Sequence, residues 1–273
     1  MRKGKNNRLV LLGIALVSMV VLLCLTSFIY LPHDPNNMNT IDRLHRPSGE
    51  YFLGTDQFGR DILSRIMIST RYALLVGLVS VAVGASIGVV IGSIGGIAKG
   101  VLQSVIMRVI DGFMAFPGML LALMLVAVTG KGLWNAVLAI AIFMIPTYAR
   151  LAYSLVIDQK NELYIKAAKS YGATPWRIIV KHILPSMLPK LITQFSSSIG
   201  GAILLESSLS FLGLGVQPPN ASLGLMLSES RQLTLSYPYL AIPSGIVLVI
   251  AILGFNLIGD ALNDTTVGRR KSV

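Results

Sequence analysis

The chain has 273 residues, of which 53% are hydrophobic and 13% are charged. Soluble domains carry about 25% charged residues, so this composition excludes a surface that is wholly exposed to water and favours a membrane protein. The net charge of +11 would also suit nucleic-acid binding, but no basic face with interleaved aromatic residues supports that function. A single cysteine, Cys24, and three histidines far apart in sequence (His33, His45 and His182) give no basis for a disulfide or a metal site.

Six apolar runs are long enough to cross a bilayer, which takes about 20 residues in a helix. They predict membrane spans at residues 9–31, 72–98, 105–128, 133–156, 190–214 and 239–262. The first run follows four basic residues and is long for a signal peptide, with no small-residue cleavage site after it, so we expect a retained anchor. The sequence therefore predicts an all-α integral membrane protein with about six transmembrane helices.

The distribution of basic residues predicts the orientation of these spans. With the N-terminus in the cytoplasm, 16 of the 23 lysines and arginines lie on the inner side and seven on the outer side. Because basic residues are enriched in cytoplasmic loops, both termini are expected in the cytoplasm.

The segment 31–71 is expected to be a neutral, folded loop on the outer side, since it carries five basic and five acidic residues. The stretch 53–61 contains two glycines, Gly54 and Gly59, and predicts a turn. Thr55 or Asp56 is expected to cap the amphipathic helix that follows this turn. We expect that helix to place three arginines at the level of the outer headgroups: Arg60, Arg65 and Arg71.

The second span contains Gly84, Gly88 and Gly92 at intervals of four residues. This spacing lets helix backbones approach closely in lipid, and it predicts a packing face within the bundle or toward a partner subunit. The alternative is the general tolerance of membrane helices for glycine.

The longest inner loop, at about 158–185, has signals for two short helices. Gly172 suits a left-handed turn that ends the first helix, and Thr174 and Pro175 suit the N-cap and first position of the second. Pro185 is expected to end that second helix.

The apolar residues of this loop are available for docking into a groove: Leu163, Ile165, Ala168, Trp176, Ile179 and Ile183. Two interpretations remain open from the residues alone. One is a rigid lever moved by a soluble partner, and the other is an amphipathic segment resting on anionic lipid.

Ala167 and Ala168, followed by Gly172 and then by Ile183-Leu184-Pro185, resemble the EAA loop of ABC importer permeases. The sequence departs from the family pattern at Lys166, where the family has a glutamate. Further blocks in the same order are similar to the "C" permease subunit of the peptide/nickel branch. They are Gly54-Thr55-Asp56 with Gly59-Arg60-Asp61, Asp111 with Phe116-Pro117, Tyr148-Ala149-Arg150, Glu206 to Pro219, and Phe255 to Asp260.

The resemblance implies a type I ABC importer permease fold in a bacterial cell membrane. Residues 1–71 would be an anchor helix and extracellular loop, and residues 72–273 the core permease domain. It implies a heterodimer with a paralogous permease, two cytoplasmic ATPase subunits and an extracellular solute-binding protein. The loop Lys166, Ala167, Ala168, Gly172, Ala173, Thr174, Pro175, Ile183, Leu184 and Pro185 would dock on one ATPase.

The chain has no Gly-x-x-x-x-Gly-Lys-Ser/Thr motif, so it is not expected to be catalytic or to bind a cofactor. ATP and Mg are expected on the partner subunits.

Charged residues within spans are costly and therefore candidates for function. Glu206 lies among serines and is open to two interpretations, a hydrated translocation path or a partner contact. Asp111 and Arg150 are candidates for the path as well, or for a pair with each other near the inner interface. Asp260 is expected to be solvated at an inner helix end.

Two other classes of membrane protein fit less well. An ion-coupled secondary transporter would have inverted repeats and broken helices around charges at the membrane midplane. Neither feature is seen in the sequence. A membrane-embedded enzyme predicts a motif such as His-Glu-x-x-His or Gly-x-Ser-x-Gly, and neither occurs. Among substrates we favour di- or oligopeptides, with nickel or a metal chelate as the alternative.

Overall fold

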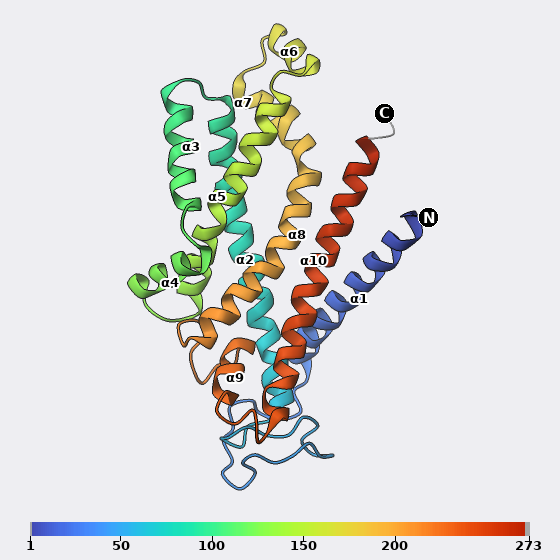
Figure 1. The fold of residues 1–273 in the computed structure, drawn as a ribbon. Helices are drawn as coiled ribbons and strands as arrows, with labels where there is room; N and C mark the ends of the chain where they lie inside the picture. The colour runs from blue at the N-terminus through green and yellow to red at the C-terminus, as the bar shows by residue number, and fades with distance from the viewer. Residues whose placement is uncertain (1, 271–273) are drawn as a thin grey trace.

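The computed structural model describes residues 2–270, with side chains from Leu9 to Asn263, and its elements are helices joined by loops (Figure 1). The long helices are α1 (Arg2–Ile29), α2 (Ile62–Ile97), α5 (Leu133–Gln159), α8 (Leu184–Phe211) and α10 (Ile242–Arg270). The shorter ones are α3 (Val101–Met114), α4 (Gly118–Thr129), α6 (Leu163–Ser170), α7 (Pro175–Ile178) and α9 (Leu223–Ser230). A π-helical turn, η1 (Ile179–Ile183), precedes α8, and a 3-10 turn, η2 (Pro238–Leu240), precedes α10.

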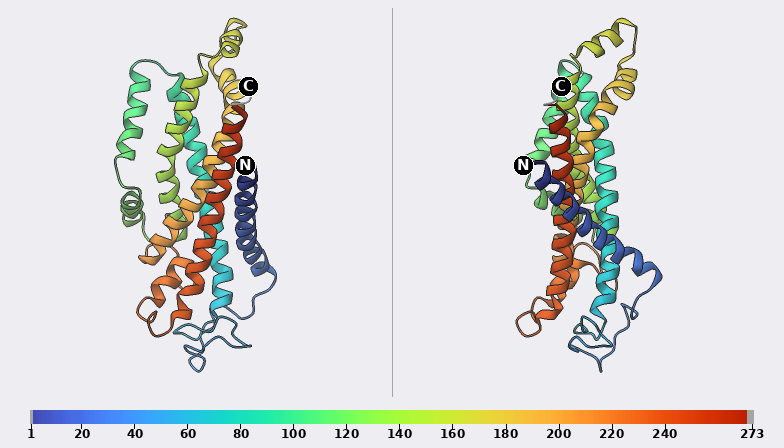
Figure 2. Two further views of the ribbon diagram at one scale, coloured as in Figure 1. Left: turned by 45° about the vertical axis from the view of Figure 1, so that its right-hand side comes forward. Right: turned by 90° about the vertical axis from the view of Figure 1, so that its right-hand side faces the viewer.

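The long helices form one elongated bundle (Figures 1 and 2). α2 and α5 are its most closely packed pair, α8 packs against α10, and α1 lies along α10 at the edge. The loop 30–61 and α9 close one end, and α6 and α7 protrude at the other (Figure 1). The start of α1 at Arg2 and the end of α10 at Arg270 lie toward the α6 end, the side of the 158–185 loop (Figure 1). The basic clusters used in the charge count, 2–8 and 269–271, lie outside the described side chains.

The glycines of α2 form the contact with α5. A Cβ atom on Gly88 would lie 2.6 Å from the Ile145 carbonyl oxygen, and one on Gly84 would lie 2.6 Å from that of Ala141. A Cβ atom on Gly92 would lie closer still to the Ala149 carbonyl oxygen. The predicted packing face is therefore confirmed, and the helix that occupies it belongs to the same chain.

Four described helices are long and apolar enough to cross a membrane: Leu9–Ile29, Ile62–Ile97, Leu133–Gln159 and Pro238–Asn263. The predicted span 105–128 is wrong as a single helix, because α3 and α4 meet at 91°. Pro117 and Gly118 cause the break, since a proline cannot extend α3 and a glycine stabilises a helix interior poorly. Counting the bent pair as one span gives five. The remaining predicted span, 190–214, is covered for the most part by α8. This helix is rich in serine and is not among the described helices that are apolar enough to cross a membrane.

The second span begins ten residues earlier than predicted. α2 starts at Ile62 and continues for 36 residues, so the expected amphipathic helix and the second span are one helix. Asp61 is its N-cap and accepts from the Ser64 amide at 2.9 Å, which corrects the assignment of that role to Thr55 or Asp56. The boundary drawn between residues 71 and 72 falls inside α2.

Candidate functional site

Residues 163–183 form a bent projection, here called the elbow, which consists of α6, α7 and η1 (Figure 1). Gly172 has φ of +79°, a left-handed conformation that ends α6 and that glycine adopts without strain. The Thr174 hydroxyl accepts from the Arg177 amide at 3.3 Å, and Pro175 is the first residue of α7. The turn predicted from these three residues is confirmed.

Pro185 does not end the second helix, contrary to the prediction. The π-helical turn η1 leads directly into α8, and Pro185 lies in the first turn of α8. Proline is tolerated in the first turn of a helix, although it has no backbone N–H group to donate. In the π turn that precedes it, the backbone hydrogen bonds join residues five apart in place of four. The elbow is therefore joined to α8 by continuous helix.

A small hydrophobic core of its own fixes the elbow. Ile165, Ile178 and Ile183 are 0–3% exposed and pack with residues of α5 and α8, namely Ala152, Leu155, Val156 and Met187. Ile165, Ile179 and Ile183 were expected to be available for docking, and that expectation is wrong because they are buried within the chain. The elbow is thus packed directly against α5 and α8.

Other large apolar side chains of the elbow point away from the protein. Tyr171 is 92% exposed, Leu163 is 80% exposed and Trp176 is 64% exposed, and Tyr164 is exposed as well. Leu163 and Trp176 were predicted as docking residues, whereas the two tyrosines were not. The position of Tyr171 directly before the left-handed Gly172, at the tip of the turn, was the signal that could have revealed it.

The remaining residues predicted for the loop differ in exposure. Lys166, Ala167, Thr174 and Pro185 are exposed, and Ala168, Ala173 and Leu184 are half-buried. A cavity of about 440 Å³ separates the elbow from the ends of α2 and α5, and Lys99, Lys160 and Lys169 line it. The elbow is therefore held mainly through its small core.

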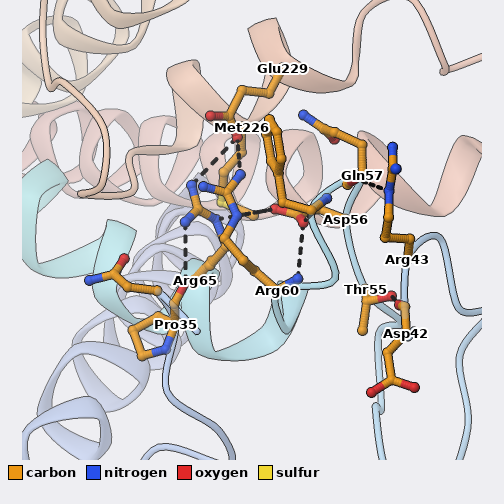
Figure 3. Close-up of polar contacts among 12 residues, drawn as sticks. Pro35, Asp42, Arg43, Thr55, Asp56, Gln57, Arg60, Arg65, Met226 and Glu229 are labelled. Carbon is orange, nitrogen blue, oxygen red and sulfur yellow. Dashed lines mark hydrogen bonds and ion pairs between the residues drawn. The ribbon is translucent and has the colours of Figure 1, made fainter. Parts of the chain in front are cut away.

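At the opposite end, two arginines and two carboxylates form a buried cluster (Figure 3). Arg60 Nε lies 2.6 Å from Asp56 Oδ2, and Arg60 Nη2 lies 2.8 Å from Glu229 Oε2. Arg65 lies 3.8 Å from Asp56 and 3.5 Å from Glu229, and it donates to the Pro35 carbonyl at 3.2 Å. The cluster joins the loop 30–61 and the start of α2 to the end of α9.

Arg60 and Arg65 are 2% and 1% exposed, so they are buried within the chain and do not face lipid headgroups. Their charge is neutralised by Asp56 and by Glu229, which sequence reasoning missed. No local signal points to Glu229, since it follows Arg60 by 169 positions.

The motif residues of the loop 30–61 serve to fold it. Gly54 and Gly59 adopt φ of +80° and +76°, and a side chain on either would meet neighbouring backbone. The Thr55 hydroxyl donates to the Asp42 carbonyl and accepts from the His45 amide. Burial is the largest cause of a raised pKa of the Tyr51 phenol and its hydrogen bond to Asp42 is the next, and the phenol donates to Asp42 Oδ2 at 3.1 Å.

Glu206 lies in α8 and is fully buried within this chain. Ser210 donates to its Oε1 atom at 2.6 Å, and Ser207 donates to its Oε2 atom at 3.3 Å. Ser207 also contacts α9, because its carbonyl lies directly against the Cα atom of Gly224. The carboxyl group of Glu206 is thus hydrogen-bonded by serines of α8, the helix that contacts α9 at Ser207 and Gly224.

Asp111 of α3 and Arg150 of α5 form the predicted ion pair. Their side chains are 51% and 48% exposed, so the pair lies at the surface of the chain. Asp260 is exposed at the surface of the chain and lies within α10, ten residues before its end at Arg270, so its solvation stays a prediction. The structure does not bring Glu206 and this ion pair into one site.

Comparison with known proteins gives one family over most of the chain. The family described as "Binding-protein-dependent transport system inner membrane component" matches residues 88–271. The glutathione transport system permease protein GsiD of Pectobacterium atrosepticum is 40% identical over 243 residues, which cover 89% of this chain and 81% of that protein. The dipeptide transport system permease protein DppC of Alkalihalophilus pseudofirmus is 40% identical over 273 residues, which cover 98% of this chain and 88% of that protein.

A third relative, the probable D,D-dipeptide transport system permease protein DdpC of Escherichia coli, is 38% identical over 90% of this chain and 84% of its own. Among solved structures, an inward-facing form of the MetNI methionine ABC transporter superposes with a TM-score of 0.60 at 20% identity. The match covers 70% of this chain and 91% of that chain, and it shows a shared fold.

Proposed function

The chain belongs to the family of binding-protein-dependent transport system inner membrane components, and we propose that it imports small peptides as the C-type permease of an ABC importer. It is a multi-pass inner membrane protein with the type I permease fold. The relatives described above are named for transport of a dipeptide, a D,D-dipeptide and glutathione. Those names support a small peptide as substrate over nickel or a metal chelate.

The proposed assembly is a heterodimer with a paralogous permease, two cytoplasmic ATPase subunits and an extracellular solute-binding protein. ATP and Mg bind to the ATPase subunits, where hydrolysis takes place, and this chain transmits the movement. The charge count and the common side of the termini and the elbow support an orientation with all three in the cytoplasm.

The elbow is the observation that carries this proposal. Its inner face is fixed to α5 and α8 by buried isoleucines, while Leu163, Tyr171 and Trp176 remain exposed on its outer face. Exposed aromatic groups on a rigid support are typical of the anchors of a protein interface. An ATPase subunit that binds them would move α5 and α8 together.

Glu206 and the Asp111–Arg150 pair are proposed to act in different places. Glu206 would hold α9 against α8 near the outer mouth of the pore. The surface pair Asp111–Arg150 would lie toward the paralogous permease or the path between the two chains.

Gly172 gives a direct test of the elbow. We expect Gly172→Asp to abolish copurification of the ATPase subunits and substrate-stimulated hydrolysis, because the substitution strains the turn and adds a charge at the docking tip. Gly100→Asp is the matched control, since Gly100 also has a positive φ, of +64°, and open space around it, but lies between α2 and α3. Normal coupling in Gly172→Asp would contradict the proposal.

The substrate is tested with the intact transporter and its binding protein in vesicles. We expect a dipeptide or glutathione to stimulate ATP hydrolysis and Ni²⁺ to have no effect. Stimulation by Ni²⁺ alone would replace the peptide assignment and leave the ABC permease assignment intact.

A further inference from the structure

Arg71 is a half-buried cation in α2 for which the described residues provide no carboxylate within ion-pairing distance. Its Nε atom donates to Ser27 Oγ at 2.6 Å, its Nη2 atom donates to the Ser27 carbonyl, and its guanidinium lies 4.0 Å from the centre of the Phe28 ring. Arg60 and Arg65, in contrast, each have carboxylate partners. The Nη1 atom of Arg71 has no hydrogen bond to the described residues, so a donor and an unbalanced charge remain for an anion.

The contacts of Arg71 also give its depth in the membrane. Ser27 and Phe28 lie in the last turn of α1, which ends at Ile29. Phe28, Tyr30 and Tyr72 place aromatic rings around this level, as is usual at the membrane–water interface. Arg71 therefore lies where the apolar part of the bilayer meets the headgroups.

Two cavities meet at Arg71, and they differ in character. The first is an apolar groove of about 460 Å³ between α1, α2 and α10, lined among others by Val17, Val21, Cys24, Leu25, Leu78 and Phe255. The second, of about 260 Å³, lies toward the outer loop and contains the polar groups of Asn36, Tyr72 and Asn220. The Tyr72 hydroxyl donates to Asn220 Oδ1 at 3.0 Å. Phe28, Arg71 and Leu75 line both cavities.

We propose that the two cavities form a binding site for one membrane phospholipid. An acyl chain occupies the groove, the phosphate group binds the guanidinium of Arg71, and the rest of the headgroup lies near Asn220. The order of groups along the protein, apolar, cationic and then polar, matches the order of groups along a phospholipid. Arginine is suited to this contact because its donors fit phosphate geometry and its charge is weakly hydrated.

The site bridges α1, α2 and α10, so a bound lipid would fasten the peripheral α1 to the rest of the bundle. Without the cation the groove would accept any acyl chain from the bilayer. The charge at its end is what makes binding selective for a phosphate-bearing lipid.

The test uses the full chain, purified in detergent and delipidated, with retained lipid measured by native mass spectrometry. The probe is palmitoyl-oleoyl phosphatidylglycerol. We expect Arg71→Leu to weaken its binding on the order of fivefold to tenfold, since one charge-assisted contact to phosphate is lost. Arg71→Lys keeps the charge and should lose less. Arg231→Leu removes an exposed arginine elsewhere and should leave binding unchanged.

Two further arms separate the parts of the site. Cys24→Trp fills the groove and should weaken phosphatidylglycerol binding with Arg71 intact, and it decides the question if Arg71→Leu does not fold. A diacylglycerol, which lacks the phosphate, and glycerol 3-phosphate, which lacks the acyl chains, should each bind more weakly than the whole lipid.

Equal binding of phosphatidylglycerol to wild type and Arg71→Leu overturns the proposal, as does equal binding of diacylglycerol or unchanged binding to Cys24→Trp. Equal binding of glycerol 3-phosphate would show a simple phosphate site and also overturns it. Release of the lipid when the paralogous permease is added would assign the groove to that partner instead.

Discussion

The Nη2 atom of Arg60 lies 2.8 Å from Oε2 of Glu229, although 169 positions separate the two residues along the chain. Arg60 belongs to the loop 30–61 and Glu229 to α9, which packs against α8. The contact therefore ties the loop 30–61 to α9, and through α9 to α8. Because both partners are largely withdrawn from water, removal of one leaves an uncompensated charge in the interior.

Glu229→Gln is expected to lower the free energy of unfolding by about 3 kcal/mol, because Arg60 and Arg65 then share the single carboxylate of Asp56. Thermal unfolding of the purified chain in micelles measures the change. Glu50→Gln removes an exposed carboxylate from the loop 30–61, to which Arg60 belongs, and is the control. Equal stability of the two variants would show that the cluster carries no buried charge.

Gly88→Ala is expected to destabilise the bundle by about 2 kcal/mol, since a methyl group would meet the Ile145 carbonyl and the Tyr148 Cβ atom across the contact of α2 with α5. Gly201→Ala in α8 has no atom within 4 Å of the added carbon and should be neutral or slightly stabilising. The same unfolding measurement compares them. A neutral Gly88→Ala would mean that α2 and α5 separate easily.

These relationships explain what the sequence can and cannot predict. The turn at Gly172, Thr174 and Pro175 is set by residues next to one another, so its conformation could be predicted. The glycine spacing of α2 indicated a packing face but not which helix fills it. That helix, α5, is known only once the chain is folded.

The failures have the same physical origin. The sequence predicted Arg60 and Arg65 to lie at the surface, because their acidic partner Glu229 is distant along the chain. Ile165 and Ile183 read as docking residues, since an apolar pattern does not say whether its partner is the same chain or another protein. Pro185 was predicted to end a helix, but the π turn η1 before it leads into α8, which continues past Pro185.

The two faces of the elbow should respond differently to mutation. Ile165→Ala leaves a cavity in the small core and is expected to cost about 3 kcal/mol locally, so hydrogen exchange of the backbone amides in the elbow should accelerate. Tyr171→Ser changes a side chain that is 92% exposed and should leave that exchange unchanged while weakening retention of the ATPase subunits.

This pair of variants separates anchoring from docking. Copurification and hydrogen exchange are measured on the same preparations, with Lys181→Gln as an exposed control outside the aromatic face. Normal ATPase retention by Tyr171→Ser, together with loss in Lys181→Gln, would place the docking surface on the other side of the elbow.

Asp111→Asn is expected to change stability by less than about 1 kcal/mol, because the Asp111–Arg150 pair is half-exposed and such pairs contribute little. A double-mutant cycle with Arg150→Gln measures the coupling, which should fall with added salt. Repeating the cycle on the chain assembled with its paralogous permease makes the test informative. If assembly withdraws the pair from water, the coupling should become larger and lose its salt dependence, whereas an unchanged cycle would show that Asp111 and Arg150 stay exposed in the transporter.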